Sequence, residues 1–156
     1  MKKPATPATR VLDQAGAEYT TLSYEYTQSG AVVAAERLGI SPHAVIKTLV
    51  MQDEEGNPLI VLMHGELEVS LKSLARQLGV KNVQTVSKRD AQRLTGYMVG
   101  GISPFGTRRR LPVYAERSIM ELPFLYINGG RRGFILGMKP QILQELLKPT
   151  LVEAAR

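Results

Sequence analysis

Two glycine-rich segments, each next to arginines, are the residues whose types and spacing most clearly suggest chemistry. The first runs from Gly96 to Gly106, interrupts an apolar stretch with four glycines and a Ser-Pro step, and is followed at once by three arginines, Arg108, Arg109 and Arg110. The second runs from Asn128 to Gly133 and contains Gly129, Gly130, Arg131 and Arg132. Glycine lets the backbone approach a ligand closely and adopt φ > 0. Both segments therefore predict a pocket wall made of main chain, and the arginines beside them favour one anionic ligand.

Lys47 is the side chain with the clearest potential for chemistry, because it interrupts the apolar run from Val45 to Met51. An ammonium on an apolar strand is costly unless it is paired or functional. The alternative is a lysine whose charged end reaches solvent at the end of the strand. Thr48 follows it and points to the opposite face by strand alternation, so its role is either packing or a hydrogen bond.

Composition limits the function classes. The 156 residues are 44% apolar, which predicts one domain over residues 1–156. The absence of cysteine excludes disulfides, thiolate metal sites and a cysteine nucleophile. Lacking a secretory signal or a membrane-length apolar run, the protein is expected in the cytoplasm with no membrane partner.

The net charge of +6 is clustered in the arginines, which favours a polyanionic partner over a merely solvated surface. The two histidines, His43 and His64, are predicted to be surface or loop residues rather than bases. No cofactor or metal is expected, since no histidine or carboxylate cluster has ligand-like spacing.

Helices are predicted from capping signals. Thr6-Pro7 and Ser41-Pro42 each combine an N-cap with proline at the first helical position. Ser70 and Ser87 are predicted to cap helices that end at Gly79 and Gly96. Further helices are predicted over 31–38 and from Pro140 onwards.

Strands are predicted over 19–26, 45–51, 59–63, 83–86, 111–115, 124–127 and 134–138, with the second and third forming a hairpin. Several of the connections are too short for parallel crossovers. The fold class is therefore α+β: a mixed, mostly antiparallel sheet that curls in a barrel-like way, with helices outside. A single pocket opening is expected where the two glycine turns meet.

Three motifs in order carry a family resemblance: Val45-Ile-Lys-Thr-Leu-Val50, Gly96-Tyr-Met-Val-Gly-Gly-Ile-Ser-Pro-Phe-Gly106 and Asn128-Gly-Gly-Arg-Arg-Gly133. With them the chain resembles the YbaK family of aminoacyl-tRNA deacylases, also called the prolyl-tRNA synthetase associated or editing-insertion domain family. The resemblance covers nearly the whole length. It implies hydrolysis of the ester between a wrong amino acid and tRNA, chiefly mischarged tRNA(Pro), with cysteine or another small amino acid removed. The implied partners are that tRNA and possibly prolyl-tRNA synthetase, and DNA is not among them.

The resemblance also implies roles for individual residues. Lys47 would orient the ester or the terminal phosphate-ribose and stabilise developing negative charge, while main-chain N–H groups of Gly100, Gly101 and Ile102 would form an oxyanion hole. With no protein nucleophile evident, water or a substrate thiol would attack the positioned ester. Further predicted substrate contacts are Tyr24, Thr48, Ser103, Pro104, Phe105, Gly129 and Gly130. Predicted phosphate contacts are Arg108, Arg109, Arg110, Arg131 and Arg132.

One departure from the family bears on specificity. Cysteine-removing relatives often carry an aspartate near the second position of the strand after the second glycine turn, where this chain has Ile135. That leaves alanine or another small amino acid open as the substrate. Two other classes also stay open: a non-catalytic tRNA- or synthetase-binding module, and a small-molecule phosphate-binding protein.

Overall fold

The computed structural model describes residues 3–156 and contains five short α-helices, four of which begin at a predicted cap or proline. Side chains of Thr6, Ser70 and Ser87 each accept a hydrogen bond from a backbone N–H in the first turn of the following helix. Such caps are worth about 1 kcal/mol each. The helices are α1 (Pro7–Gln14), α2 (Ala31–Leu38), α3 (Leu71–Leu78), α4 (Lys88–Thr95) and α5 (Pro140–Leu147), with 3-10 turns at Pro42–Ala44 and Arg117–Glu121.

Eight strands form one mixed sheet in the order β1-β7-β6-β2-β3-β5-β8, with β4 paired to β2. The pairs of β2 with β6, β3 with β5 and β5 with β8 are parallel, and the other pairs are antiparallel. The sheet curls but does not close, since its path ends at β1 and β8. The strands are β1 (Thr20–Ser23), β2 (Val45–Asp53), β3 (Pro58–His64), β4 (Val83–Thr85), β5 (Val113–Glu116), β6 (Leu125–Arg131), β7 (Phe134–Met138) and β8 (Thr150–Val152).

The predicted α+β class with a mixed sheet and outer helices is confirmed, as is the β2–β3 hairpin. Two details differ. The first strand is shorter than predicted, because the chain leaves β7 after Tyr24 donates its N–H to Gly133. The strand β8 was missed, because its three residues pair only with β5, a partner distant in sequence.

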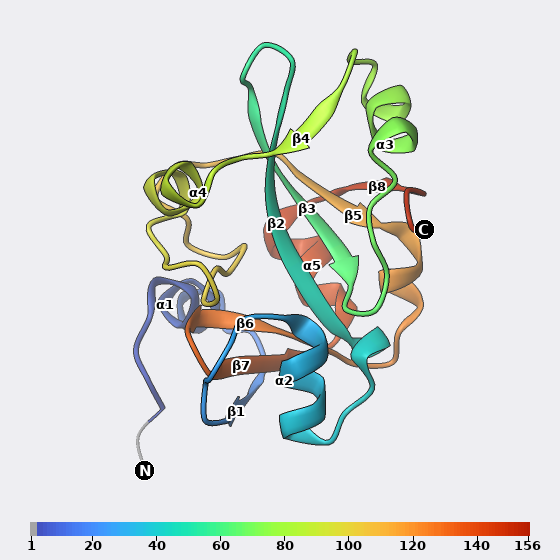
Figure 1. Ribbon diagram of the computed structural model, residues 1–156. Coiled ribbons are helices and arrows are strands. Elements are labelled where there is room, and N and C mark those ends of the chain that lie inside the picture. Colours follow the sequence, from blue (N-terminus) through green and yellow to red (C-terminus); the bar gives the residue numbers. More distant parts are fainter. Residues whose placement is uncertain (1–2) are drawn as a thin grey trace.

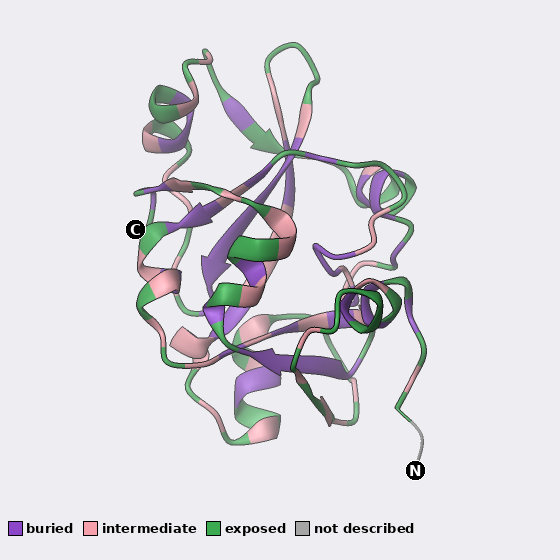
Figure 2. Ribbon diagram, turned by 180° about the vertical axis from the view of Figure 1, so that it is seen from behind, coloured by how far each residue is buried: buried purple, intermediate pink, exposed green. Residues whose placement is uncertain are grey.

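The elements cover the sheet unevenly (Figure 1). Helix α5 lies behind the strands, α2 lies in front of the lower end, and α1 and α4 lie on one side with α3 on the other. Seen from behind, the strands are mostly buried while the helices turn exposed faces outward (Figure 2). One core cluster joins α1, α4, α5 and the middle of the sheet, and a smaller cluster lies beneath α3. Among the described residues, no helix is long and apolar enough to cross a membrane.

The two glycine segments meet as expected. A Cβ on Gly101 would lie 2.9 Å from the backbone nitrogen of Arg132, so the segments touch through their main chains. Behind this contact, Tyr97 is buried and its hydroxyl donates to the carbonyl of Phe105 at 2.6 Å. The loop is therefore fixed from inside by one aromatic side chain.

Tyr97→Phe tests that fixation. The change leaves the buried Phe105 carbonyl without its donor, which costs about 1–3 kcal/mol. We expect the melting temperature to fall by roughly 2–4 °C per kcal/mol for a chain of this size. Burial raises the pKa of Tyr97 to about 12, so its phenol should also resist alkaline titration in the folded protein. Tyr114→Phe, at a half-buried tyrosine of β5, is the matched control, and equal melting shifts for both variants would contradict the assigned role.

Candidate functional site

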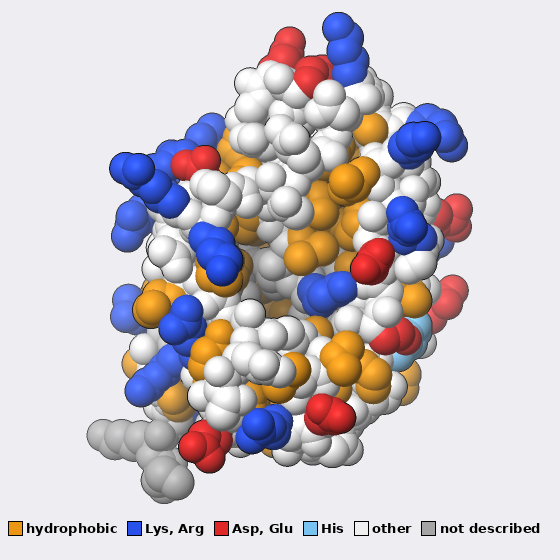
Figure 3. All heavy atoms as spheres, in the orientation of Figure 1, with side chains coloured by type: hydrophobic (Ala, Val, Ile, Leu, Met, Phe, Trp, Pro, Cys, Tyr) orange, Lys and Arg blue, Asp and Glu red, His pale blue; other side chains and the backbone are white. Residues whose placement is uncertain are grey.

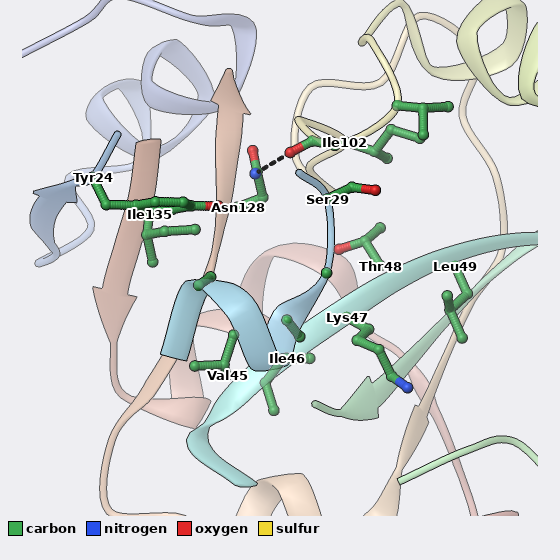
Figure 4. Close-up of a pocket in the computed structure, with 15 residues that line it drawn as sticks. Tyr24, Ser29, Val45, Ile46, Lys47, Thr48, Leu49, Ile102, Asn128 and Ile135 are labelled. Atoms are coloured by element: carbon green, nitrogen blue, oxygen red, sulfur yellow. Dashed lines mark hydrogen bonds between the residues drawn. The ribbon is translucent and has the colours of Figure 1, made fainter. Parts of the chain in front are cut away.

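A pocket of about 240 Å³ lies between the middle of the sheet, the start of α2 and the first glycine segment. Figure 3 shows a hollow in the corresponding face of the molecule, and Figure 4 shows the residues around it. The lining residues are Tyr24, Ser29, Gly30, Ala31, Ala34, Val45, Ile46, Lys47, Thr48, Leu49, Val99, Gly100, Ile102, Asn128 and Ile135. The pocket therefore unites all three motifs picked out in the sequence.

Lys47 lines the pocket and is half-buried on β2. Its ammonium donates a hydrogen bond to the carbonyl of Leu67, in the loop after β3. In Figure 4 the side chain extends away from Asn128 and Ile102, so the amine points away from the glycine segment. Burial lowers the pKa of Lys47, and the nearby carboxylates of Glu68 and Glu66 raise it in part.

Thr48 is a pocket residue with an unpaired hydroxyl. Its Oγ1 is the one buried side-chain N or O atom without a hydrogen-bond partner in the part of the chain that the structure describes. Buried polar atoms in proteins are nearly always paired, so an orphan hydroxyl calls for an explanation. Thr48 lines the pocket, and Figure 4 shows its oxygen turned to the side where Ser29 lies. The wall of the pocket therefore contains one hydroxyl without a hydrogen-bond partner.

Asn128 is a pocket residue that was not among the predicted contacts. Its side-chain NH₂ donates to the carbonyl of Gly100 at 3.1 Å, and its side-chain oxygen accepts from the N–H of Gly130 at 2.8 Å. One amide therefore holds the two glycine segments in register. The available signal was an asparagine at the end of an apolar strand, directly before two glycines.

Tyr24 and Ile135 form the end of the pocket opposite Lys47 (Figure 4). Tyr24 is half-buried, and burial raises the pKa of its phenol. Ile135 lies on β7 with 3% of its surface exposed. At this end the pocket therefore presents an aliphatic side chain.

The predicted oxyanion hole needs a correction. The N–H of Gly101 donates to the carbonyl of Met98 at 2.8 Å, which closes a turn and uses that donor. Gly101 is buried behind the lining, whereas its neighbours Gly100 and Ile102 line the pocket. Its contact with the backbone of Arg132 makes it the place where the two loops touch.

Five other predicted substrate contacts are packed behind the pocket wall. Ser103 and Phe105 are almost fully buried, and the Ser103 hydroxyl accepts the N–H of Phe105 at 3.2 Å. Pro104 is buried between them. A Cβ on Gly129 would meet the Phe134 ring, and one on Gly130 would meet the Tyr97 ring. The structure therefore leaves these five residues out of the pocket lining and keeps Tyr24, Lys47, Thr48, Gly100 and Ile102 on the pocket surface.

The predicted phosphate contacts Arg108, Arg109, Arg110, Arg131 and Arg132 are all exposed. Arg132 also supports the site, because its Nε donates to the carbonyl of Val99 at 2.9 Å and its guanidinium lies over the Tyr26 ring. Tyr26 in turn lies close against Gly100. This arginine is therefore tied to the loop that forms the pocket.

The histidines are not independent surface residues. His64 has no exposed surface, stacks on the His43 ring at 3.7 Å, and contacts the His43 carbonyl and the Ser118 hydroxyl through its two ring nitrogens. His43 contacts Glu66 at 2.7 Å. Ligand atoms of His43, His64 and Glu66 lie within 4.8 Å of one another, a grouping that sequence spacing concealed. Because both ring nitrogens of His64 already have partners and the rings are parallel, the group holds the end of β3 against the 3-10 turn Pro42–Ala44.

Comparison with known proteins assigns the family. The profile of the aminoacyl-tRNA editing domain matches residues 27–146. A protein of Enterococcus faecalis (strain ATCC 700802 / V583), named as a candidate Cys-tRNA(Pro)/Cys-tRNA(Cys) deacylase EbsC, is 28% identical over 95% of this chain and 92% of its own length. A proline--tRNA ligase of Brachyspira hyodysenteriae (strain ATCC 49526 / WA1) is 26% identical over 55% of this chain, a match that spans 15% of the ligase.

Solved structures agree on the fold. A structure described as a candidate trans-editing enzyme for prolyl tRNA synthetase superposes with a TM-score of 0.85 at 22% identity, covering 98% of this chain and 99% of that chain. A structure described as hypothetical protein APE2540 superposes with a TM-score of 0.88 at 22% identity, covering 97% and 100%. The chain belongs to the family of aminoacyl-tRNA editing domains, and its enzyme class is that of an aminoacyl-tRNA deacylase.

Proposed function

We propose that this protein hydrolyses the ester that links a wrongly attached small amino acid, cysteine or alanine, to the 3′ end of tRNA(Pro). The observation that carries the proposal is a pocket lined by both Lys47 and Thr48, whose hydroxyl has no hydrogen-bond partner. An ester with its neighbouring ribose hydroxyl supplies partners for both groups. The names of the relatives support the choice of tRNA(Pro).

Within this proposal the chain positions and polarises the ester, and water attacks it. Lys47 has three N–H donors, of which the Leu67 carbonyl takes one. The others can face the charge that develops on the ester oxygen, where a preorganised donor is worth several kcal/mol. Ser103 is unsuited to nucleophilic attack, since it has no exposed surface. If the substrate is a cysteinyl ester, its own thiol is a second possible nucleophile.

The pocket favours a small apolar side chain. Its volume of about 240 Å³ is below the roughly 300–1,000 Å³ of pockets for drug-sized ligands. Ala31, Ala34, Val45 and Ile135 give it aliphatic walls. With Ile135 at the position where an aspartate would stand, we infer that alanine is removed at least as well as cysteine. A synthetase pocket separates such small residues by only about 1–3 kcal/mol, which explains the need for editing.

The proposed partners are mischarged tRNA(Pro) and, for delivery, prolyl-tRNA synthetase. Action on aminoacyl-tRNA would place the protein in the cytoplasm, where translation takes place. The test is a deacylation panel of tRNA(Pro) charged with Cys, Ala, Ser or Pro, plus Ala on tRNA(Ala). We expect Ala-tRNA(Pro) and Cys-tRNA(Pro) to be cleaved and Pro-tRNA(Pro) to be spared. Hydrolysis of none of these would favour a non-catalytic tRNA- or synthetase-binding module instead.

The lowered pKa of Lys47 predicts how the deacylation rate depends on pH. If the ammonium is the active form, activity is full at low pH and falls as the pH rises through the lowered pKa of Lys47. Glu68→Gln removes the larger of the two carboxylate effects that raise this pKa. We therefore expect the alkaline fall in single-turnover rate, corrected for spontaneous hydrolysis, to move to lower pH. Glu145→Gln, at an exposed position of α5, is the control, and a shift to higher pH in Glu68→Gln would refute the assignment.

A further inference from the structure

The positive charge of the molecule is concentrated in one segment. Residues 86–112 contain six basic residues and one acidic residue, while the rest of the chain contains 14 basic and 13 acidic residues. The single acid, Asp90, is already paired with Arg93 at 3.2 Å. Nearly the whole net charge of +6 therefore comes from α4 and the loop after it.

The fold brings both ends of this segment together. The backbone N–H groups of Arg108 and Arg109 donate to the carbonyls of Thr95 and Leu94, at 2.9 and 3.0 Å. The three consecutive arginines thus start at the C-terminal end of α4. On the helix, Lys88, Arg89 and Arg93 are exposed, and Arg89 and Arg93 share one face at i,i+4 spacing. In Figure 3, Lys and Arg side chains gather on the side where Figure 1 places α4, next to the hollow.

This basic surface is joined to the pocket by one residue. The Gln92 side chain of α4 accepts the N–H of Val99 at 3.0 Å, and Val99 lines the pocket. Arg132 reaches the carbonyl of the same residue. An RNA strand that leaves the pocket across the loop containing Val99 would therefore reach α4 next.

We propose that the exposed face of α4, formed by Lys88, Arg89 and Arg93, binds the phosphates of the acceptor-stem duplex of the RNA whose 3′ end occupies the pocket. The inference rests on the proposed function and adds a duplex-binding surface to it. A single-stranded 3′ tail fits the pocket and loop, whereas the duplex that follows needs an open, basic surface. Such contacts recognise backbone and shape rather than sequence.

The experiment compares two double variants of the full-length protein. Arg89→Ala/Arg93→Ala removes two charges at i,i+4 on α4, and Lys72→Ala/Arg76→Ala removes two exposed charges at the same spacing on α3, on the other side of the molecule. The probes are uncharged tRNA(Pro) and a single-stranded RNA ending in CCA, each titrated at several salt concentrations. Deacylation of the panel substrates gives kcat and KM.

We expect the α4 double variant to bind tRNA(Pro) about tenfold more weakly, with a salt slope smaller by about one for each phosphate contact removed. KM should rise with kcat unchanged, and binding of the single-stranded RNA should stay as in the unaltered protein. The α3 variant should match the unaltered protein throughout. Equal effects of the two variants on tRNA binding would overturn the inference, as would unchanged tRNA binding in the α4 variant. Failure of the unaltered protein to cleave any ester would instead refute the hydrolytic function, while the binding measurements still test the surface.

Discussion

Lys47→Ala should lower kcat/KM for deacylation by about 10²–10³-fold, the range seen when one preorganised charge-stabilising donor is removed. The lysine is half-buried in the pocket wall, and burial already lowers its pKa. Its charge is costly to hold there, so the free energy of unfolding should change by less than about 1 kcal/mol. The measurement is single-turnover hydrolysis together with thermal unfolding.

Lys72→Ala, on the exposed face of α3, is the control and should leave both properties unchanged. Lys47→Met keeps the length and apolar stem while removing the charge, so it should be as inactive as the alanine variant. Full turnover in Lys47→Met would show that the lysine contributes packing alone.

Gly101→Ala should have the second largest effect. Its new methyl group would lie 2.9 Å from the nitrogen of Arg132 and 3.0 Å from the carbonyl carbon of Arg131. These are backbone atoms, so the two loops must separate. Overpacking of this kind costs about 1–3 kcal/mol, and a displacement near 1 Å at a reacting group can cost about 10²-fold in rate. We expect a fall in both melting temperature and kcat/KM.

Gly56→Ala separates the two effects. Gly56 has φ +79, and a Cβ there would meet nothing within 4 Å, so alanine adds backbone strain without a clash. It lies in the β2–β3 turn, outside the pocket. This variant should lose stability but keep its activity per folded molecule. If Gly101→Ala also loses stability but keeps its activity per folded molecule, the contact of Gly101 with Arg131 and Arg132 does not shape the site.

Local signals explain why most of the fold is predictable from the sequence. Thr6, Ser70 and Ser87 cap their helices through contacts within three residues, so their signals are complete in a short window. The same holds for the apolar strands β2 and β3. By contrast, β8 is defined by its pairing with β5, and no short window contains that information.

The part of the site that could be predicted from the sequence is the part where a residue type in its context has a single structural explanation. Lys47 in an apolar strand pointed to the pocket, and the glycine segments to its wall. Glycine also serves close packing, however, and sequence cannot separate the two uses: Gly129 and Gly130 make room for the rings of Phe134 and Tyr97. The unpaired hydroxyl of Thr48 and the stacking of His64 on His43 depend on residues distant in sequence, so they can be recognised only in the folded chain.

The most direct test of the account is a crystal structure of the protein with a non-hydrolysable analogue, an alanyl group joined through an amide to the 3′ position of adenosine. The account predicts the alanyl methyl near Ile135 and Ala34, a hydrogen bond from the analogue to Thr48 Oγ1, and the Lys47 ammonium beside the linking carbonyl. An analogue bound outside this pocket, with the Thr48 hydroxyl still unpaired, would contradict it.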